Sequence, residues 1–171
     1  MTPEQRAARL RLVALDVDGV LTDGRLYYGP QGEALKVFDV RDGHGIKMLI
    51  GHGVEVAILS ARSSEIVGAR ARELGIGRVL QGRGDKAVAW NDLLRDTGVA
   101  AEQAGFIGDD LPDLPVLAQA GFAATVADAR DEVKDAAHWI AGQAGGRGAV
   151  RAFAEFILRA KGVDFTGMTR G

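Results

Sequence analysis

The sequence predicts an α/β fold in which helices cover both faces of a central, mostly parallel β-sheet. Short apolar runs rich in β-branched residues alternate along the chain with longer segments of helical period. Such alternation is typical of parallel strands joined by right-handed helical crossovers. Glycines gather between these segments, at 51–53, 81–85 and 144–148, as expected of loops.

The length and composition favour one domain. We expect it to span residues 1–171, with a core over about 10–162 and a C-terminal tail at 163–171. The formal net charge is −2, which is no basis for binding nucleic acid or an anionic membrane. Cysteine is absent, so disulfides, thiolate metal sites and a cysteine nucleophile are excluded. The polar N-terminus and the lack of a transmembrane-length apolar run predict a cytoplasmic protein.

Six apolar runs are predicted as strands. The first two, LVALDV at 12–17 and VEVAIL at 54–59, are nearly continuous, as expected of strands that are buried on both faces. The other predicted strands are at 77–81, 104–107, 122–126 and 138–141.

Helical periodicity predicts six helices between and after these strands. The clearest is at 148–161, where Val150, Phe153, Phe156 and Ile157 define one apolar face. The others are predicted at about 43–52, 63–74, 86–97, 112–120 and 131–137.

One stretch breaks the alternation. GRLYYGPQGEALKVFD, at 24–39, has two extended arms around a GPQG turn and predicts a β-hairpin. Because it follows the first strand directly, it should project over the same end of the sheet. The elements together predict a Rossmann-like three-layer sandwich with a projecting hairpin.

Two carboxylates, Asp16 and Asp18, come at the tip of the first strand, where ligands bind in parallel α/β folds. One carboxylate can attack phosphorus, and a second can protonate the leaving alcohol and later activate water. A Mg²⁺ ion would screen the repulsion between carboxylate and phosphate. For this pattern alone, a turn capped by both acids is an equal alternative.

The other strand ends carry groups that suit a phosphate and a cation. Ser60 and the following N–H groups could hold a phosphate, although Ser60 would also serve as an ordinary helix cap. Lys86, at the start of a predicted helix, opposes the helix dipole and needs an anionic partner unless it lies in solvent. Asp109, Asp110 and Asp113 suit a cation site, and helix capping explains at most two of them.

The motifs DVDGVLTDG, LSAR, GDK and GDDLPDLP follow one another at successive strand ends. They resemble the four motifs of the haloacid dehalogenase superfamily of phosphotransferases, and the pair Asp16 and Asp18 resembles its phosphatase branch. Over roughly residues 10–162 the chain is similar to the capless 3-deoxy-D-manno-octulosonate 8-phosphate phosphatase family, through FDVRDGHGIKML, VADA and AGGRGAVRAF.

The resemblance implies a role for each matching residue. Asp16 would be the nucleophile and a Mg²⁺ ligand, and Asp18 the general acid/base and a ligand through its backbone carbonyl. Lys86, with Ser60 and Ala61, would hold the phosphoryl group, and Asp109 would complete the metal site. Asp110 and Asp113 would support the metal site. The residues that would contact the substrate are Asp39, Val40, Arg41, Asp42, Gly43, Lys47, Arg62 and Arg70.

The implied reaction is Mg²⁺-dependent hydrolysis of 3-deoxy-D-manno-octulosonate 8-phosphate, a step in lipopolysaccharide biosynthesis, through an aspartyl-phosphate. Arginines among the implied contacts suit a substrate with both a carboxylate and a phosphate. A nine-carbon sialic-type acid 9-phosphate is the alternative substrate. A non-catalytic regulatory or structural domain is the alternative function.

The spacing of the motifs leaves no room for a cap domain, since only about 36 residues separate Asp23 from Ser60. The hairpin and neighbouring subunits would then exclude water, and the resemblance implies a homotetramer. Tyr27, Tyr28 and Leu35 give the hairpin apolar surface to bury, and Arg147 would approach a bound anion.

Overall fold

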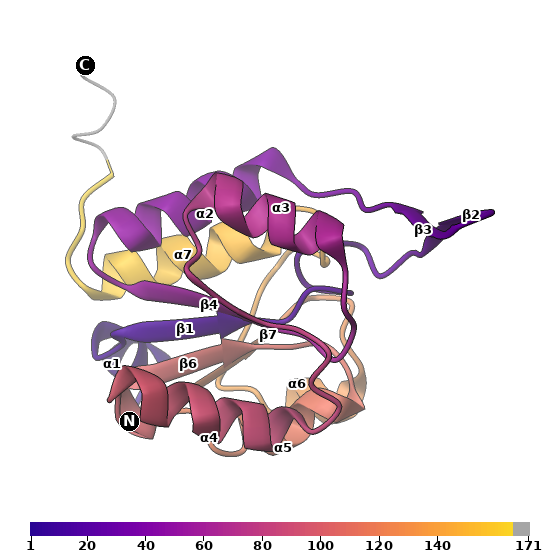
Figure 1. The fold of residues 1–171 in the computed structure, drawn as a ribbon. Helices are drawn as coiled ribbons and strands as arrows, with labels where there is room; N and C mark the ends of the chain where they lie inside the picture. Colours follow the sequence, from indigo (N-terminus) through magenta and orange to yellow (C-terminus); the bar gives the residue numbers. More distant parts are fainter. Residues whose placement is uncertain (166–171) are drawn as a thin grey trace.

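The computed structural model describes residues 1–165, and an all-parallel, six-stranded sheet forms its centre (Figure 1). All six predicted strands are present, and none is more than two residues shorter than predicted. The strand order is β5-β4-β1-β6-β7-β8. The strands are β1 (Leu12–Leu15), β4 (Glu55–Leu59), β5 (Arg78–Leu80), β6 (Ala104–Ile107), β7 (Phe122–Thr125) and β8 (Trp139–Ile140).

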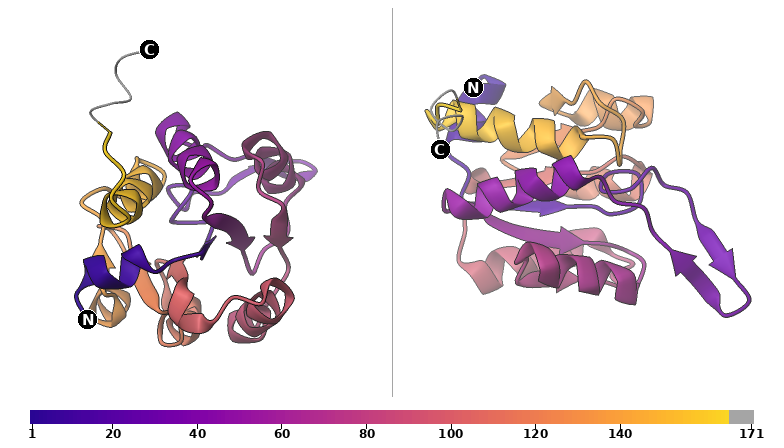
Figure 2. Two further views of the ribbon diagram at one scale, coloured as in Figure 1. Left: turned by 90° about the vertical axis from the view of Figure 1, so that its left-hand side faces the viewer. Right: turned by 90° about the horizontal axis from the view of Figure 1, so that it is seen from above.

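Helices cover both faces of this sheet, which confirms the predicted three layers (Figures 1 and 2). On one face lie α2 (Val40–Gly51), α3 (Glu65–Leu74) and α7 (Ala149–Ala160). On the other lie α4 (Lys86–Thr97), α5 (Leu114–Leu117) and α6 (Asp131–Ala136). Within residues 1–165, no helix is both apolar enough and long enough to span a membrane.

The prediction of a continuous helix at 112–120 is wrong, and this segment differs most from what was expected. It is a 3₁₀ turn, η2 (Leu111–Asp113), followed by the single-turn α5. Pro112 and Pro115 each lack an N–H donor, so a continuous helical ladder cannot run through both. A second 3₁₀ turn, η1 (Ala101–Gln103), precedes β6 and was not predicted.

One helix begins earlier than predicted, and one short helix was not predicted. α2 begins at Val40 rather than 43, because the Asp39 carboxylate accepts a hydrogen bond from the Arg41 N–H at 2.7 Å and caps the helix. The short α1 (Pro3–Ala8) was missed, although its sequence signal is present. Thr2 and Gln5 form a reciprocal capping box around it.

The predicted hairpin is confirmed. β2 (Tyr27–Gly29) and β3 (Gly32–Leu35) pair antiparallel in a sheet of their own, which projects beyond the carboxyl ends of the central strands (Figures 1 and 2). Its apolar side chains are largely in solvent, with Tyr28 62% exposed and Leu35 45% exposed. Between β1 and β4 the chain holds only this hairpin and α2, with no cap domain.

Apolar packing holds α7 on the face of the sheet that α2 and α3 also cover. Phe153 and Ile157 of α7 are fully buried, and Phe153 stacks on Phe122 of β7 with ring centroids 6.0 Å apart. Because β1 pairs in register with both β4 and β6, the carboxyl ends of these three strands meet at one edge. The chain reverses its winding direction between β1 and β6, the place where such sheets bind ligands.

Candidate active site

The carboxyl ends of β1, β4 and β6 surround one pocket of about 210 Å³. Pro112 and Arg62 are among the residues that line it. The rest are predicted catalytic, metal and phosphate residues, namely Asp16, Asp18, Ser60, Ala61, Lys86, Asp109, Asp110 and Asp113.

A buried cluster of charges forms the floor of the pocket. The Lys86 ammonium lies 2.8 Å from Asp16 Oδ1 and 2.5 Å from Asp113 Oδ1, and all three residues are at most 6% exposed. Lys86 enters from the first turn of α4, where a cation opposes the helix dipole. The two carboxylates are the anionic partners that this position needs.

Burial and neighbouring charges shift the protonation of this cluster. Burial, followed by the charge of Asp113, raises the pKa of Asp16 to about 6, against the lowering effect of Lys86. Burial lowers the pKa of Lys86, but the charges of Asp16 and Asp113 outweigh it, so that pKa ends above its usual value. Lys86 therefore stays cationic, the state suited to holding a phosphoryl group.

Asp113 organises the neighbouring loop. Its Oδ2 accepts hydrogen bonds from the backbone N–H groups of Asp109, at 2.9 Å, and Asp110, at 3.2 Å, while Oδ1 faces Lys86. Both of its oxygens are engaged, which suits the supporting role implied for it. The Asp110 side chain accepts from the Leu111 N–H and caps η2 instead of entering the cluster.

Asp109 has a carboxylate oxygen that lacks a hydrogen-bond partner among the described residues. This oxygen, Oδ1, is buried. Burial, then the charges of Asp16 and Asp113, raise the pKa of Asp109 to about 8. Oxygen atoms of Asp16, Asp109 and Asp113 lie within 4.8 Å of one another. An all-oxygen set with excess negative charge fits Mg²⁺.

Two glycines allow the close packing around this carboxylate. Gly19, with φ of +93°, passes so close that a Cβ there would lie 2.1 Å from Asp109 Oδ2. Gly145 backs the same loop, since a Cβ there would lie 1.8 Å from the Gly19 carbonyl oxygen. The 144–148 segment thus supports the loop after Asp16, while the Arg147 guanidinium lies 3.9 Å from Asp23.

Ser60 lies directly after β4, and its side chain is buried. Sequence reasoning set it at a helix N-terminus, but α3 begins five residues later, with Ser64 as its N-cap residue. Ser60 Oγ instead accepts from the Arg62 N–H at 3.3 Å within a loop that lines the pocket.

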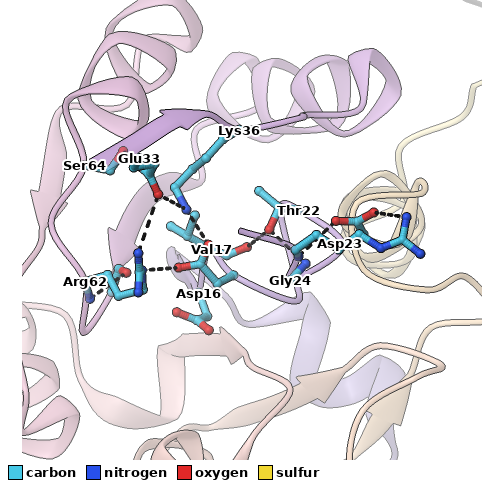
Figure 3. A network of polar contacts seen from close by, with 12 residues as sticks. Asp16, Val17, Thr22, Asp23, Gly24, Glu33, Lys36, Arg62 and Ser64 are labelled. Carbon is cyan, nitrogen blue, oxygen red and sulfur yellow. Dashed lines mark hydrogen bonds and ion pairs between the residues drawn. The ribbon is translucent and has the colours of Figure 1, made fainter. Parts of the chain in front are cut away.

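Asp18 is tied to the hairpin by residues that the sequence did not reveal (Figure 3). Lys36 Nζ lies 2.5 Å from Asp18 Oδ1 and 3.0 Å from Glu33 Oε1. Burial lowers the pKa of Lys36, but its contacts with both carboxylates outweigh this and raise it. The other carboxylate oxygen, Asp18 Oδ2, lies 3.6 Å from Arg62 Nε. No local pattern in GEALK signals these contacts.

Most of the implied substrate contacts lie outside this pocket. Asp39 and Arg41 pair with each other at 2.7 Å at the start of α2. Asp42 is 1% exposed, and its carboxylate accepts from the Gly148 and Arg151 N–H groups at the start of α7. The others line a separate groove of about 190 Å³ between α2 and α3, formed by Val40, Gly43, His44, Lys47, Arg70, Glu73 and Leu74.

Comparisons with known proteins agree with this geometry. A family model for haloacid dehalogenase-like hydrolases matches residues 75–153. The 3-deoxy-D-manno-octulosonate 8-phosphate phosphatase of Yersinia pestis is 48% identical over 157 residues, which cover 92% of this chain and 84% of that protein.

Solved structures show the same likeness. A probable phosphatase of the yrbI family from Pseudomonas syringae has a TM-score of 0.94 at 46% identity, covering 98% of this chain and 95% of that chain. The 3-deoxy-D-manno-octulosonate 8-phosphate phosphatase of Moraxella catarrhalis, in complex with a magnesium ion, a phosphate ion and KDO, has a TM-score of 0.93 at 38% identity, with the same coverage.

The fold and the site thus define a haloacid dehalogenase-like hydrolase. Within that superfamily, the chain belongs to the 3-deoxy-D-manno-octulosonate 8-phosphate phosphatase family, and it is a phosphatase.

Proposed function

We propose that this phosphatase hydrolyses 3-deoxy-D-manno-octulosonate 8-phosphate in a Mg²⁺-dependent reaction. The observation that carries the proposal is the buried Asp16 carboxylate, 2.8 Å from the Lys86 ammonium, in a pocket that Asp18 and Asp109 also line. Relatives at 43–48% identity with this named activity support the substrate. The proposed role lies in lipopolysaccharide biosynthesis, and a cytoplasmic location stays a prediction from the sequence.

In the proposed reaction, an Asp16 carboxylate oxygen forms a bond to phosphorus while the bond from phosphorus to the sugar oxygen breaks. Asp18 gives a proton to that oxygen, which leaves as the sugar alcohol. Asp18 then takes a proton from water, whose oxygen bonds to phosphorus while the bond from phosphorus to Asp16 breaks; this releases inorganic phosphate and restores the Asp16 carboxylate. Lys86, with Ser60 and Ala61, holds the phosphoryl oxygens throughout.

Mg²⁺ would be held by Asp16, Asp109 and the Asp18 backbone carbonyl, and it would neutralise charge on the phosphoryl group. Asp109 Oδ1, which has no hydrogen-bond partner within residues 1–165, and the raised pKa values of Asp16 and Asp109 support a cation at this place. Asp110 and Asp113 would support these ligands, Asp113 through its hydrogen bonds to the loop.

The sugar acid would contact Arg62 within the pocket. The remaining proposed contacts are Asp39, Val40, Arg41, Asp42, Gly43, Lys47 and Arg70. These residues lie along α2 and the groove between α2 and α3, and none lines the active-site pocket of its own chain. The exposed ones would therefore contact a substrate bound in the pocket of a neighbouring subunit. Asp42 would not touch the substrate and would contribute only by tying the start of α2 to the start of α7 through its bonds to the Gly148 and Arg151 N–H groups.

The test is a comparison of catalytic efficiency across phosphorylated sugar acids, with Mg²⁺ and after chelation. We expect the eight-carbon 8-phosphate to be hydrolysed most efficiently, activity to vanish in EDTA and Mg²⁺ to restore it. Ca²⁺ should restore little, because it prefers longer bonds and more ligands. Preference for a nine-carbon 9-phosphate would contradict the substrate, and full activity after thorough chelation would contradict the metal. Hydrolysis of no phosphate ester would favour a non-catalytic domain.

We also propose a homotetramer in which the hairpin packs against a neighbouring subunit, since its apolar residues are exposed in the single chain. Tyr27 and Leu35 face each other across the hairpin. Replacing both with serine should weaken assembly and lower turnover of the sugar phosphate together. Sedimentation of the variant, beside Ile140→Ser as a control for an exposed apolar residue on β8, checks this. A wild-type monomer with full activity would refute it.

A further inference from the structure

Lys36 is a buried cation that the proposed reaction does not use. Its side chain is 2% exposed, although it follows the last residue of a hairpin that otherwise projects into solvent. A charge removed from water in this way needs close partners. Lys36 has two, Asp18 Oδ1 at 2.5 Å and Glu33 Oε1 at 3.0 Å (Figure 3).

The position of Lys36 is held from the hairpin and from the loop after β4. Glu33 sits three residues before it on β3 and accepts a hydrogen bond from the Ser64 hydroxyl. Tyr28 of β2 accepts a hydrogen bond on its hydroxyl from Arg62 Nη2 at 3.1 Å. Both strands of the hairpin are therefore tied to the loop after β4, Tyr28 through Arg62 and Glu33 through Ser64, so Lys36 presents its ammonium from a fixed point.

The contacts distinguish the two oxygens of the Asp18 carboxylate. Oδ1 is engaged by Lys36, whereas Oδ2 lies 3.6 Å from Arg62 Nε, and Arg62 and Asp18 both line the pocket. A carboxylate that must pass a proton to a leaving group works best when one chosen oxygen faces that group. The hydrogen bond from Lys36 to Oδ1 fixes the rotation of the carboxylate and so leaves Oδ2 as the oxygen that can face the leaving group.

We propose that Lys36 is a positioning residue for proton transfer by Asp18, holding Oδ1 so that Oδ2 faces the leaving group. The proposal rests on the proposed phosphatase reaction. It makes the hairpin part of the proton-transfer apparatus, in addition to any part it has in assembly. Lys36 itself touches neither substrate nor the reacting atoms in this arrangement.

The test uses two phosphate esters that differ in their need for a proton. A sugar alcohol leaves poorly as an alkoxide and needs the proton, whereas p-nitrophenolate is a stable anion that leaves without it. The value of kcat/KM reports steps up to departure of the leaving group, so later hydrolysis of the aspartyl-phosphate does not enter. We expect Lys36→Met to lower kcat/KM about 10- to 100-fold for the sugar phosphate, within the range of lost acid catalysis.

For p-nitrophenyl phosphate, the same variant should lose less than about threefold. Lys36→Arg keeps the charge and the hydrogen bond and should recover part of the lost activity with the sugar phosphate. Lys161→Met removes another partly buried lysine, whose ammonium bonds the Ala8 carbonyl at the far end of α7, and should change neither value. Circular dichroism and the melting temperature check that each variant is folded.

The outcomes separate the two proposals. If the wild-type protein hydrolyses neither ester, the proposed function fails before the role of Lys36 is tested. If the wild-type protein is active and Lys36→Met lowers kcat/KM equally for both esters, or raises it for the sugar phosphate, the positioning role is wrong. If Lys36→Met does not fold, Lys36→Ala, which also removes the hydrogen bond but leaves room for water beside the two carboxylates, takes its place in the same comparison, with the same expected loss.

Discussion

Asp16→Asn is expected to lower kcat by at least about 10³-fold while leaving the fold intact. Asparagine keeps the shape of the side chain but is a poor nucleophile, so no covalent intermediate can form. The fold should survive because Lys86 keeps its second partner, Asp113 Oδ1, at 2.5 Å. Steady-state turnover with a sugar phosphate, together with the melting temperature, measures both expectations. More than a few percent of wild-type turnover would rule out Asp16 as the nucleophile.

Asp18→Asn is the matched comparison, since it alters the second carboxylate of the same strand tip. It should lower turnover by roughly 10²–10⁴-fold, the usual contribution of acid/base catalysis. In kcat/KM, which excludes the later attack of water, the loss should be smaller with an aryl phosphate than with a sugar phosphate, because the aryl leaving group needs no proton. Equal losses for the two variants with every substrate would mean that the assigned roles do not differ.

Asp109→Asn is expected to have opposite effects on catalysis and on the stability of the metal-free protein. Activity should fall sharply, and Mg²⁺ should bind at least about 100-fold more weakly, because a ligand is lost. The metal-free variant should nevertheless be more stable than the wild type at alkaline pH. The reason is that Asp109 is a buried carboxylate beside Asp16 and Asp113, with one oxygen that no described residue satisfies.

The pH dependence follows from the raised pKa of Asp109. In the folded, metal-free protein this carboxyl holds its proton up to about pH 8, whereas in the unfolded chain it loses the proton near about pH 4. The folded state thus binds the extra proton between these values, so this group lowers stability progressively as the pH rises from about 4 to about 8. Asp16, with a pKa raised to about 6, acts in the same direction.

Thermal unfolding in EDTA from about pH 4 to about pH 9 measures this difference. The two proteins should have similar melting temperatures at the acid end. At the alkaline end, Asp109→Asn should unfold higher, by about 2–4 °C for each kcal/mol gained. Added Mg²⁺ should then raise the wild-type melting temperature more than that of the variant. A variant that is no more stable at the alkaline end, or that keeps the wild-type response to Mg²⁺, would contradict this account.

The order of elements and the location of the site follow from local sequence. Strands such as LVAL at 12–15 are short and apolar throughout, and α7 carries its apolar face at helical spacing. These patterns depend on which residues are near in sequence, so they can be recognised without the fold. Once the sheet is parallel, the carboxyl ends of neighbouring strands must share an edge. Asp16, Ser60 and Asp109 were therefore predictable as neighbours, and they line one pocket.

Boundaries were less predictable where side-chain contacts decide them. The start of α2 depends on the cap formed by Asp39, and the short α5 on two prolines in close succession. The aspartate and the prolines are visible in the sequence. However, the spacing of apolar residues does not show whether a cap or a proline will decide where the helix begins or ends.

The sequence by itself determined the α/β class, the projecting hairpin and the aspartates at the strand tips, because local periodicity and strand direction carry that information. Only the tertiary structure decided that Lys36 meets Asp18, that Asp42 caps α7, and that Gly145 backs Gly19. Each of these contacts joins residues far apart in the chain. The residues near a lysine, an aspartate or a glycine in sequence do not indicate which distant residue it will contact. That contact is decided by which ends of helices and strands become neighbours when the elements pack.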